Sequence, residues 1–217
     1  MQGKFEISMM GELTFFLGLQ VKQSKDGTFI SQTKYTRDLT WMQKLIASRT
    51  DITFAVGVCA RFQFAPKESH MTSLKSIIRY VGATTDLGIW YTKDINTNLV
   101  GFSDSDWAGD VVDQKSTTGG CFYLENNLVS WYSKKQNCVS LLTVESEYVA
   151  VGSCCTQLLW VNQMIEDYGL QSGTLIVYCD NMSYISTDKQ LADIFTKPLC
   201  ESRFEELKNE LGLIELS

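Results

Sequence analysis

Two aspartates stand at the end of an apolar run that predicts a β-strand. Residues 99–106 read LVGFSDSD, and side chains along a strand alternate between its two faces. We therefore expect Asp104 and Asp106 to share a face with the apolar Phe102. Burying an ionised carboxylate costs several kcal/mol unless a positive charge meets it. The pattern predicts that a cation lies at the end of this strand.

A further carboxylate comes from a long helix predicted between Thr143 and Tyr168. Residues spaced by three, four or seven form one mainly apolar stripe that should face the sheet: Glu147, Ala150, Val151, Cys154, Leu158, Val161 and Ile165. Glu147 then points inward, whereas Glu145, about 200° away around the helix, points outward. The alternative is that Glu147 lies close enough to the helix start to reach water and to favour the helix dipole.

Asp180 ends the apolar run LIVYCD at residues 175–180, which is typical of a buried parallel strand. Ligands of open α/β sheets gather beyond the carboxyl ends of the strands, so we expect Asp104, Glu147 and Asp180 to converge there. Carboxylate ligands without histidine favour a hard ion such as Mg²⁺ or Mn²⁺. Two such ions about 3.5–4 Å apart are a recurring device for phosphodiester hydrolysis. The three acids therefore predict a divalent metal site.

The elements that must position these acids follow from periodicity and turn residues. Upstream we expect a β-hairpin that turns at Asp26-Gly27 and then the start of a helix, both within residues 5–39, followed by helices at 51–64 and 69–82 and a polar linker at 84–98. Gly82 is predicted to cap the second helix, and His70 to be a solvated residue in its first turn. Downstream we expect a hairpin of residues 120–124 and 128–134, the helix from Thr143 stopped by Gly169, and the strand 175–180. Strand, hairpin, helix and strand in this order predict an α/β sheet with mixed pairing.

Charge and composition limit the classes of function. The 217 residues carry a net charge of −6 and a pI near 4.9, whereas a protein that binds nucleic acid alone usually has a basic surface. Any such binding must rest on a local patch, for which Lys115, Lys134 and Lys135 are candidates. The same lysines can equally be plain solvated side chains.

The sequence shows no sign of a membrane or secretory segment. No apolar run approaches the roughly 18 residues of a membrane span, and the start lacks the layout of a signal peptide. Seven cysteines occur without a C-x-x-C pair, and His70 is the single histidine, which leaves little material for a zinc site. We therefore expect free thiols in a reducing, intracellular compartment, in the cytoplasm or the nucleus.

Several segments of the sequence resemble a known family. The segments SDSDWAGDVVDQKSTTGGCFYLENNLVSWYSKKQ, TVESEYVAVGSCCTQLLW, YCDN and QLADIFTKPL resemble the ribonuclease H domain of Ty1/copia-type retrotransposon Pol polyproteins. The upstream segments FEISMMGELTFFLGLQVKQSKDGTFISQTKY and ASRTDITFAVGVCARFQFAPKESHMTSLKSIIRYV resemble the end of the reverse transcriptase and its connection region. The resemblance covers nearly the whole chain, and its motifs occur in the family's order.

The resemblance implies a fold, a site and a reaction. It implies a ribonuclease H-like mixed sheet flanked by helices at 96–217, after a reverse transcriptase remnant at 1–95. Asp104, Glu147, Asp180 and Asp193 match the family's four acids, with Asp104 preferred over Asp106 and Glu147 over Glu145. In the family these acids hold two Mg²⁺ or Mn²⁺ ions that hydrolyse the RNA strand of an RNA/DNA hybrid. The expected partners are the hybrid and the remainder of the Pol polyprotein.

The chain departs from the family pattern at two places. The family has a further helix and strand between the CDN and QLAD motifs, whereas here only 193 − 180 = 13 positions separate Asp180 from Asp193. The domain is thus expected to be incomplete after Ile185, with Asp193 reaching the site on a short loop. A second segment is shortened within KYTRDLTWMQKLIASRTD. No Tyr-x-Asp-Asp motif occurs, so we expect no polymerase activity.

Two functional hypotheses remain open. One is a metal-dependent ribonuclease H, impaired by the deletions, and the other is a catalytically silent relic of a mobile element with no selected activity. The triplet Asp104-Ser105-Asp106 also matches the D-x-D of metal-dependent glycosyltransferases, but three residues are a weak signal. A phosphatase D-x-D-x-T motif fails because Ala108 stands in the place of its threonine.

Overall fold

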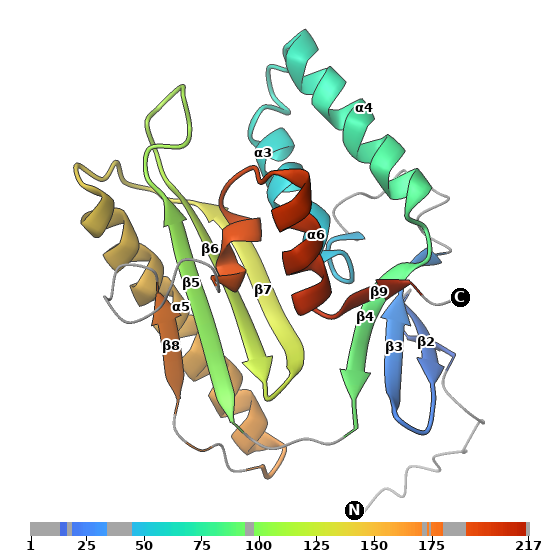
Figure 1. The fold of residues 1–217 in the computed structure, drawn as a ribbon. Helices are drawn as coiled ribbons and strands as arrows, with labels where there is room; N and C mark the ends of the chain where they lie inside the picture. The colour runs from blue at the N-terminus through green and yellow to red at the C-terminus, as the bar shows by residue number, and fades with distance from the viewer. Residues whose placement is uncertain are drawn as a thin grey trace, which may run out of the picture.

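The structure, a computed structural model, has two β-sheets with helices packed around them (Figure 1). The first sheet is antiparallel, and the second is mixed. It describes residues 14–16, 19–33, 45–93, 98–170, 173, 175–179 and 190–215. Element labels follow Figure 1. The α/β class is as the sequence predicts.

The second sheet carries the predicted strand of Asp104. Its order is β7-β6-β5-β8, formed by β5 (Leu99–Asp106), β6 (Thr117–Leu124), β7 (Asn127–Lys135) and β8 (Ile176–Cys179). The β6–β7 hairpin turns through Glu125, which takes a positive φ of 56°, and its strands are longer than predicted. β8 runs parallel to β5 and places Cys179 beside Ser103. Mixed pairing and the parallel strand are therefore confirmed.

Helix α5 (Thr143–Asp167) covers one face of this sheet. Its predicted stripe is largely confirmed, with these residues buried: Ala150, Cys154, Leu158, Val161 and Ile165. They pack on Leu99, Phe122 and Leu124 in one apolar core. The helix ends before Gly169, whose φ of 79° is the left-handed conformation that glycine adopts at little cost. None of the described helices is long and apolar enough to span a membrane.

The opposite face of the second sheet is covered by two shorter helices (Figure 1). These are the 3₁₀ helix η4 (Leu191–Phe195) and helix α6 (Glu201–Glu210). Ile194, Phe195 and Leu207 pack there on Tyr123 of β6. The expectation that Asp193 lies on a short loop is wrong, because Asp193 belongs to η4. Ile194 and Phe195 of this helix are buried against the sheet, and this packing holds the helix in place.

The first sheet has the order β1-β2-β3-β4-β9. Its strands are β1 (Phe15–Phe16), β2 (Leu19–Gln23), β3 (Gly27–Ser31), β4 (Leu87–Thr92) and β9 (Leu213–Glu215). The hairpin that turns at Asp26-Gly27 is confirmed, because β2 and β3 pair on either side of that turn. The predicted segments before residue 14 and after residue 33 lie outside the described residues. The linker predicted at 84–98 is wrong, because β4 occupies its middle and pairs with both β3 and β9.

A helical pair lies beside both sheets (Figure 1). The 3₁₀ turn η2 (Thr50–Ile52) leads into α3 (Thr53–Arg61), and α4 (Glu68–Ala83) follows. The predicted cap at Gly82 is wrong by two residues, because α4 continues to Ala83 and Thr84 is its C-cap. His70 lies in the first turn of α4 as expected but is half-buried: it stacks on Phe62 at 4.0 Å between ring centroids, and its Nδ1 accepts a hydrogen bond from the Lys67 N–H.

The two sheets are connected at several points. The predicted domain boundary after residue 95 falls within residues 94–97, outside the described residues. Strand β9, at the far end of the chain, pairs with β4 of the first sheet. The Trp131 indole N–H of β7 donates to the carbonyl of Ile46 at 3.2 Å, and Thr92 and Asn127 exchange hydrogen bonds.

Candidate active site

Asp104 is buried at the carboxyl end of β5, with 2% of its surface exposed. It shares the face of Phe102, as predicted, and this is the face covered by η4 and α6. The hydroxyl of Thr196 donates a hydrogen bond to Asp104 Oδ2. The Lys197 ammonium lies 3.6 Å from the same oxygen. In the described structure, the ammonium of Lys197 thus supplies a positive charge beside the buried Asp104 carboxylate.

Asp193 approaches the same lysine from η4. Its Oδ1 lies 2.7 Å from Lys197 Nζ, so one ammonium bridges the carboxylates of Asp104 and Asp193. Burial raises the pKa of Asp193, and the neighbouring charge of Asp104 adds to this, while Lys197 opposes it. The structure thus brings together the first and last of the four predicted acids.

A glycine in β6 lets η4 come this close to the sheet. Gly119 stands opposite Asp104 in the β5–β6 pair. A Cβ at Gly119 would lie 2.6 Å from Thr196 Cγ2 and 2.7 Å from Phe195 Cβ, which is closer than carbon atoms can approach. The buried Gln190 adds a polar anchor, because its Nε2 donates to the Ser103 carbonyl at 3.0 Å. These contacts fix Asp193 relative to Asp104.

Asp106 lies on the same face but has a different partner. Its carboxylate accepts a hydrogen bond from the Thr117 N–H at the start of β6, which closes the loop between β5 and β6. Gly109 leaves the space for this carboxylate, since a Cβ there would overlap Asp106 Oδ2. Burial raises the pKa of Asp106 to about 6, despite the hydrogen bond from Thr117 and the charge of Arg61.

The other predicted acids have different positions. Glu147 is half-buried on α5, and one of its carboxylate oxygens is shielded from solvent. It belongs to α5, the helix that covers the face of the sheet opposite η4. Glu145 is exposed and accepts a hydrogen bond from the Leu141 N–H at 2.7 Å. Asp180 lies outside the described residues, although β8, the strand directly before it, runs beside β5.

These residues do not form a complete metal site in the described part of the chain. No group of three or more His, Cys, Asp or Glu residues is placed there so that it could hold an ion. The two carboxylates that do converge, of Asp104 and Asp193, share the ammonium of Lys197. Asp180, the other strand-end acid of the predicted site, lies outside the described residues.

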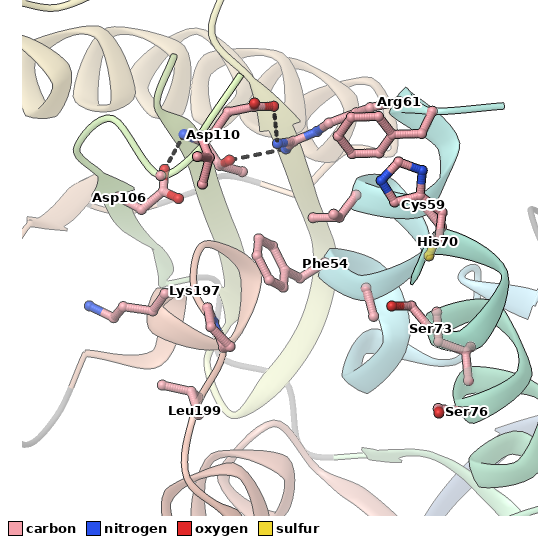
Figure 2. A pocket seen from close by; sticks show the side chains of 18 of the residues that line it. Phe54, Cys59, Arg61, His70, Ser73, Ser76, Asp106, Asp110, Lys197 and Leu199 are labelled. Atoms are coloured by element: carbon pink, nitrogen blue, oxygen red, sulfur yellow. Dashed lines mark hydrogen bonds and ion pairs between the residues drawn. The ribbon is translucent and has the colours of Figure 1, made fainter. Parts of the chain in front are cut away.

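A groove of about 840 Å³ runs from this strand end to α3 and α4. Figure 2 shows Asp106, Asp110 and Lys197 on its sheet side, and Arg61 and His70 on its helix side. The floor is largely apolar. Arg61 connects the two sides, because it lies 3.7 Å from Asp110 Oδ2 and donates to Thr117 Oγ1 at 3.0 Å.

The three lysines predicted to contact nucleic acid differ in their surroundings. Lys135 pairs with Asp110 at 2.6 Å and with Asp113 at 2.8 Å, so its charge is neutralised within the protein. Lys134 is exposed on β7, and Lys115 is half-buried in the loop between β5 and β6. Lys134 is therefore the most available of the three for a phosphate.

Sequence reasoning missed the residues that hold the cluster together. Thr196 and Lys197 stand in the FTKPL part of a motif that was quoted for Asp193 alone, and Gly119 belongs to the pair Gly119-Gly120 inside an apolar strand. A glycine within a strand signals the close approach of another segment. That signal, together with the lysine four residues after Asp193, could have found the arrangement.

Comparisons with known proteins bear on the origin of this cluster. The chain is 27% identical over 290 positions to the retrovirus-related Pol polyprotein from transposon RE2 of Arabidopsis thaliana, covering 98% of this chain and 20% of that protein. It is 36% identical to the Pol polyprotein from transposon TNT 1-94 of Nicotiana tabacum, over 68% of this chain and 11% of that protein. A third relative is the secreted RxLR effector protein 161 of Plasmopara viticola, 39% identical over 55% of this chain and 84% of that protein. No family model and no solved structure matches.

The alignment with the RE2 polyprotein has a further implication. It extends over 290 positions although this chain has 217 residues, so the relative carries segments that have no counterpart here. This agrees with the internal deletions inferred from the motifs. The chain spans about a fifth of the length of the RE polyproteins that it matches from end to end. It belongs to the Pol polyproteins of copia-type retrotransposons.

Proposed function

We propose that this chain is a retrotransposon-derived ribonuclease H-like protein. Its ancestral activity is hydrolysis of the RNA strand of RNA/DNA hybrids with two Mg²⁺ or Mn²⁺ ions, held by Asp104, Glu147, Asp180 and Asp193. In the present chain this activity is impaired. The observation that carries the proposal is the convergence of Asp104 and Asp193, which are 89 positions apart (193 − 104), on Lys197 at the end of β5.

Three features support the ancestry and two support the impairment. A buried aspartate at a strand end, a parallel strand beside it and a helix that carries Glu147 agree with the family pattern. The impairment is supported by the lysine between the two carboxylates, since Mg²⁺ demands near-ideal octahedral geometry from its ligands. The net charge of −6 weakens the binding of a polyanion such as the hybrid and makes that binding strongly sensitive to salt.

The test is cleavage of a labelled RNA/DNA hybrid by the purified chain. We expect weak cleavage in Mn²⁺ and less in Mg²⁺, abolished in Asp104→Asn and retained in Asp113→Asn. Asp113 is a matched control because it is an aspartate of the adjoining loop, with 39% of its side chain exposed. Cleavage as fast as that of an intact ribonuclease H would refute the impairment. Equal cleavage by Asp104→Asn would refute the site, and no cleavage under any condition would favour the silent relic.

A further inference from the structure

Lys197 occupies the place between two carboxylates where a divalent ion would otherwise be attracted. Its Nζ lies 2.7 Å from Asp193 Oδ1 and 3.6 Å from Asp104 Oδ2. Asp104 has 2% of its side chain exposed and Asp193 has 12%, whereas Lys197 has 39%. The two acids are thus fixed and enclosed, while the lysine reaches them from the solvent side.

The three groups differ in how firmly the fold holds them. Asp104 lies on β5 and is bonded by Thr196, and Asp193 lies on a 3₁₀ helix packed against Gly119. Lys197 follows η4 on a flexible four-carbon side chain, and lysine is a compact point charge without directional demands. The lysine is therefore the member of the cluster with the longest and most exposed side chain.

We propose that Lys197 is a built-in counter-ion that competes with divalent cations for the carboxylates of Asp104 and Asp193. In the cation-free protein its ammonium neutralises one of the two charges and stabilises η4 on β6. A divalent ion binds these carboxylates after the ammonium has been displaced. Lys197 therefore sets a threshold cation concentration for the site, and it is a positioning residue. The inference rests on the proposed function in that it takes the same carboxylates as the cation site.

The chain offers a second lysine with nearly the same surroundings. Lys135 also bridges two aspartates, Asp110 at 2.6 Å and Asp113 at 2.8 Å, with 26% of its side chain exposed. At that cluster Arg61 supplies a further positive charge, 3.7 Å from Asp110. Removing Lys135 therefore leaves Asp110 still paired, whereas removing Lys197 takes away the ammonium that Asp104 and Asp193 share. Lys135→Met is the matched control for Lys197→Met.

The test measures Mn²⁺ binding and thermal unfolding of the full chain without any hybrid. We expect Lys197→Met to unfold at a lower temperature than wild type without Mn²⁺, and to bind Mn²⁺ about tenfold more tightly or better, since one like charge has been removed at close range. Lys197→Arg should behave as wild type, and Asp104→Asn combined with Lys197→Met should lose the gain. Lys135→Met should lower the unfolding temperature without a gain in Mn²⁺ affinity.

A measurement on the wild-type protein covers the case in which Lys197→Met does not fold. Reductive methylation of Lys197, followed by mass spectrometry, should be slow without Mn²⁺ and faster at saturating Mn²⁺, whereas the exposed Lys134 should react at one rate throughout. Unchanged Mn²⁺ affinity or weaker binding in Lys197→Met, or a Lys197 methylation rate that Mn²⁺ does not change, would overturn the inference. None of these readouts uses the hybrid, so their failure is distinguishable from failure of the cleavage test.

Discussion

Arg49 forms the most heavily bonded buried ion pair among the described residues, and its removal gives the sharpest test of the fold. Arg49 is 1% exposed, and its guanidinium donates to Asp51 through two hydrogen bonds of 3.0 and 2.7 Å. It also donates to the carbonyl and hydroxyl oxygens of Thr84 at 2.9 and 2.7 Å. Tyr80 completes the network with a 2.8 Å bond to Asp51 Oδ2. The network holds the start of α3 to the end of α4.

Arg49→Met should cost about 3–5 kcal/mol in the free energy of unfolding, because it leaves the fully buried Asp51 carboxylate without its cation. Asp51→Asn should cost a similar amount, since it leaves a buried guanidinium with a weaker partner. The double variant should cost clearly less than the sum of the two, because the charges are removed together. Urea unfolding followed by tryptophan fluorescence and circular dichroism measures all three.

The control for this prediction is an exposed pair of the same type. Arg203 lies 2.7 Å from Glu206, whose side chain is 55% exposed, so Glu206→Gln should cost no more than about 1 kcal/mol. A loss below about 1 kcal/mol for Arg49→Met, or full additivity in the double variant, would contradict the reasoning. Either result would mean that Arg49 does not neutralise Asp51 in the folded protein.

Three further predictions follow from single residues. Gly119→Ala should push η4 away from β6 and destabilise the protein by about 1–3 kcal/mol, whereas Gly152→Ala on α5, which has nothing within 4 Å of the new Cβ, should be neutral or stabilising in the same urea titration. The pKa of Asp110 is lowered, because hydrogen bonds from Lys135 and Val112 outweigh burial. The contribution of Asp110 to stability should therefore be present above the ordinary pKa of 3.8 and be lost as the pH falls below that value. Asp110→Asn should flatten this part of the curve of stability against pH. The Cys200 thiol is exposed and its pKa is lowered by a hydrogen bond with Ser202, so iodoacetamide should modify it faster than Cys121 and Cys154, whose pKa values burial raises, as peptide mapping would show.

The elements that sequence reasoning found are those with a strong period or a clear stop. The stripe of α5 runs from Glu147 to Ile165 along a helix of 25 residues that ends before a glycine, and β5 alternates between its two faces, with Phe102 and Asp104 on the same one. Strand β4 was missed because its six residues stand between the polar stretches TTD and KDINTN, and its pairing partners lie far away in the chain. Helix η4 has five residues, too few for a periodic signal.

The candidate site was predictable in its residue types and less so in its contacts. Asp104 follows from the strand pattern, and Asp193 from the family resemblance. The lysine that joins them does not, because its contact with Asp104 spans 93 positions (197 − 104) and depends on how η4 packs on β6. Gly119 permits that packing through the absence of a side chain, which leaves only an indirect trace in a sequence.

The first sheet and its helices also bear on the site, although Asp104 lies in the second sheet. Arg61 of α3 contacts Asp110, within the loop that follows Asp106, and Thr117, the first residue after that loop. Helix α6 packs on η4 in the same core as Tyr123 and continues into β9, which is bonded to β4. The segment that carries Asp193 and Lys197 is therefore held from both sides, by the second sheet beneath it and by the first sheet at its end. A chain cut at residue 95 would lose Arg61 and the partner strand of β9 together, and with them two of the constraints that place Lys197 between its carboxylates.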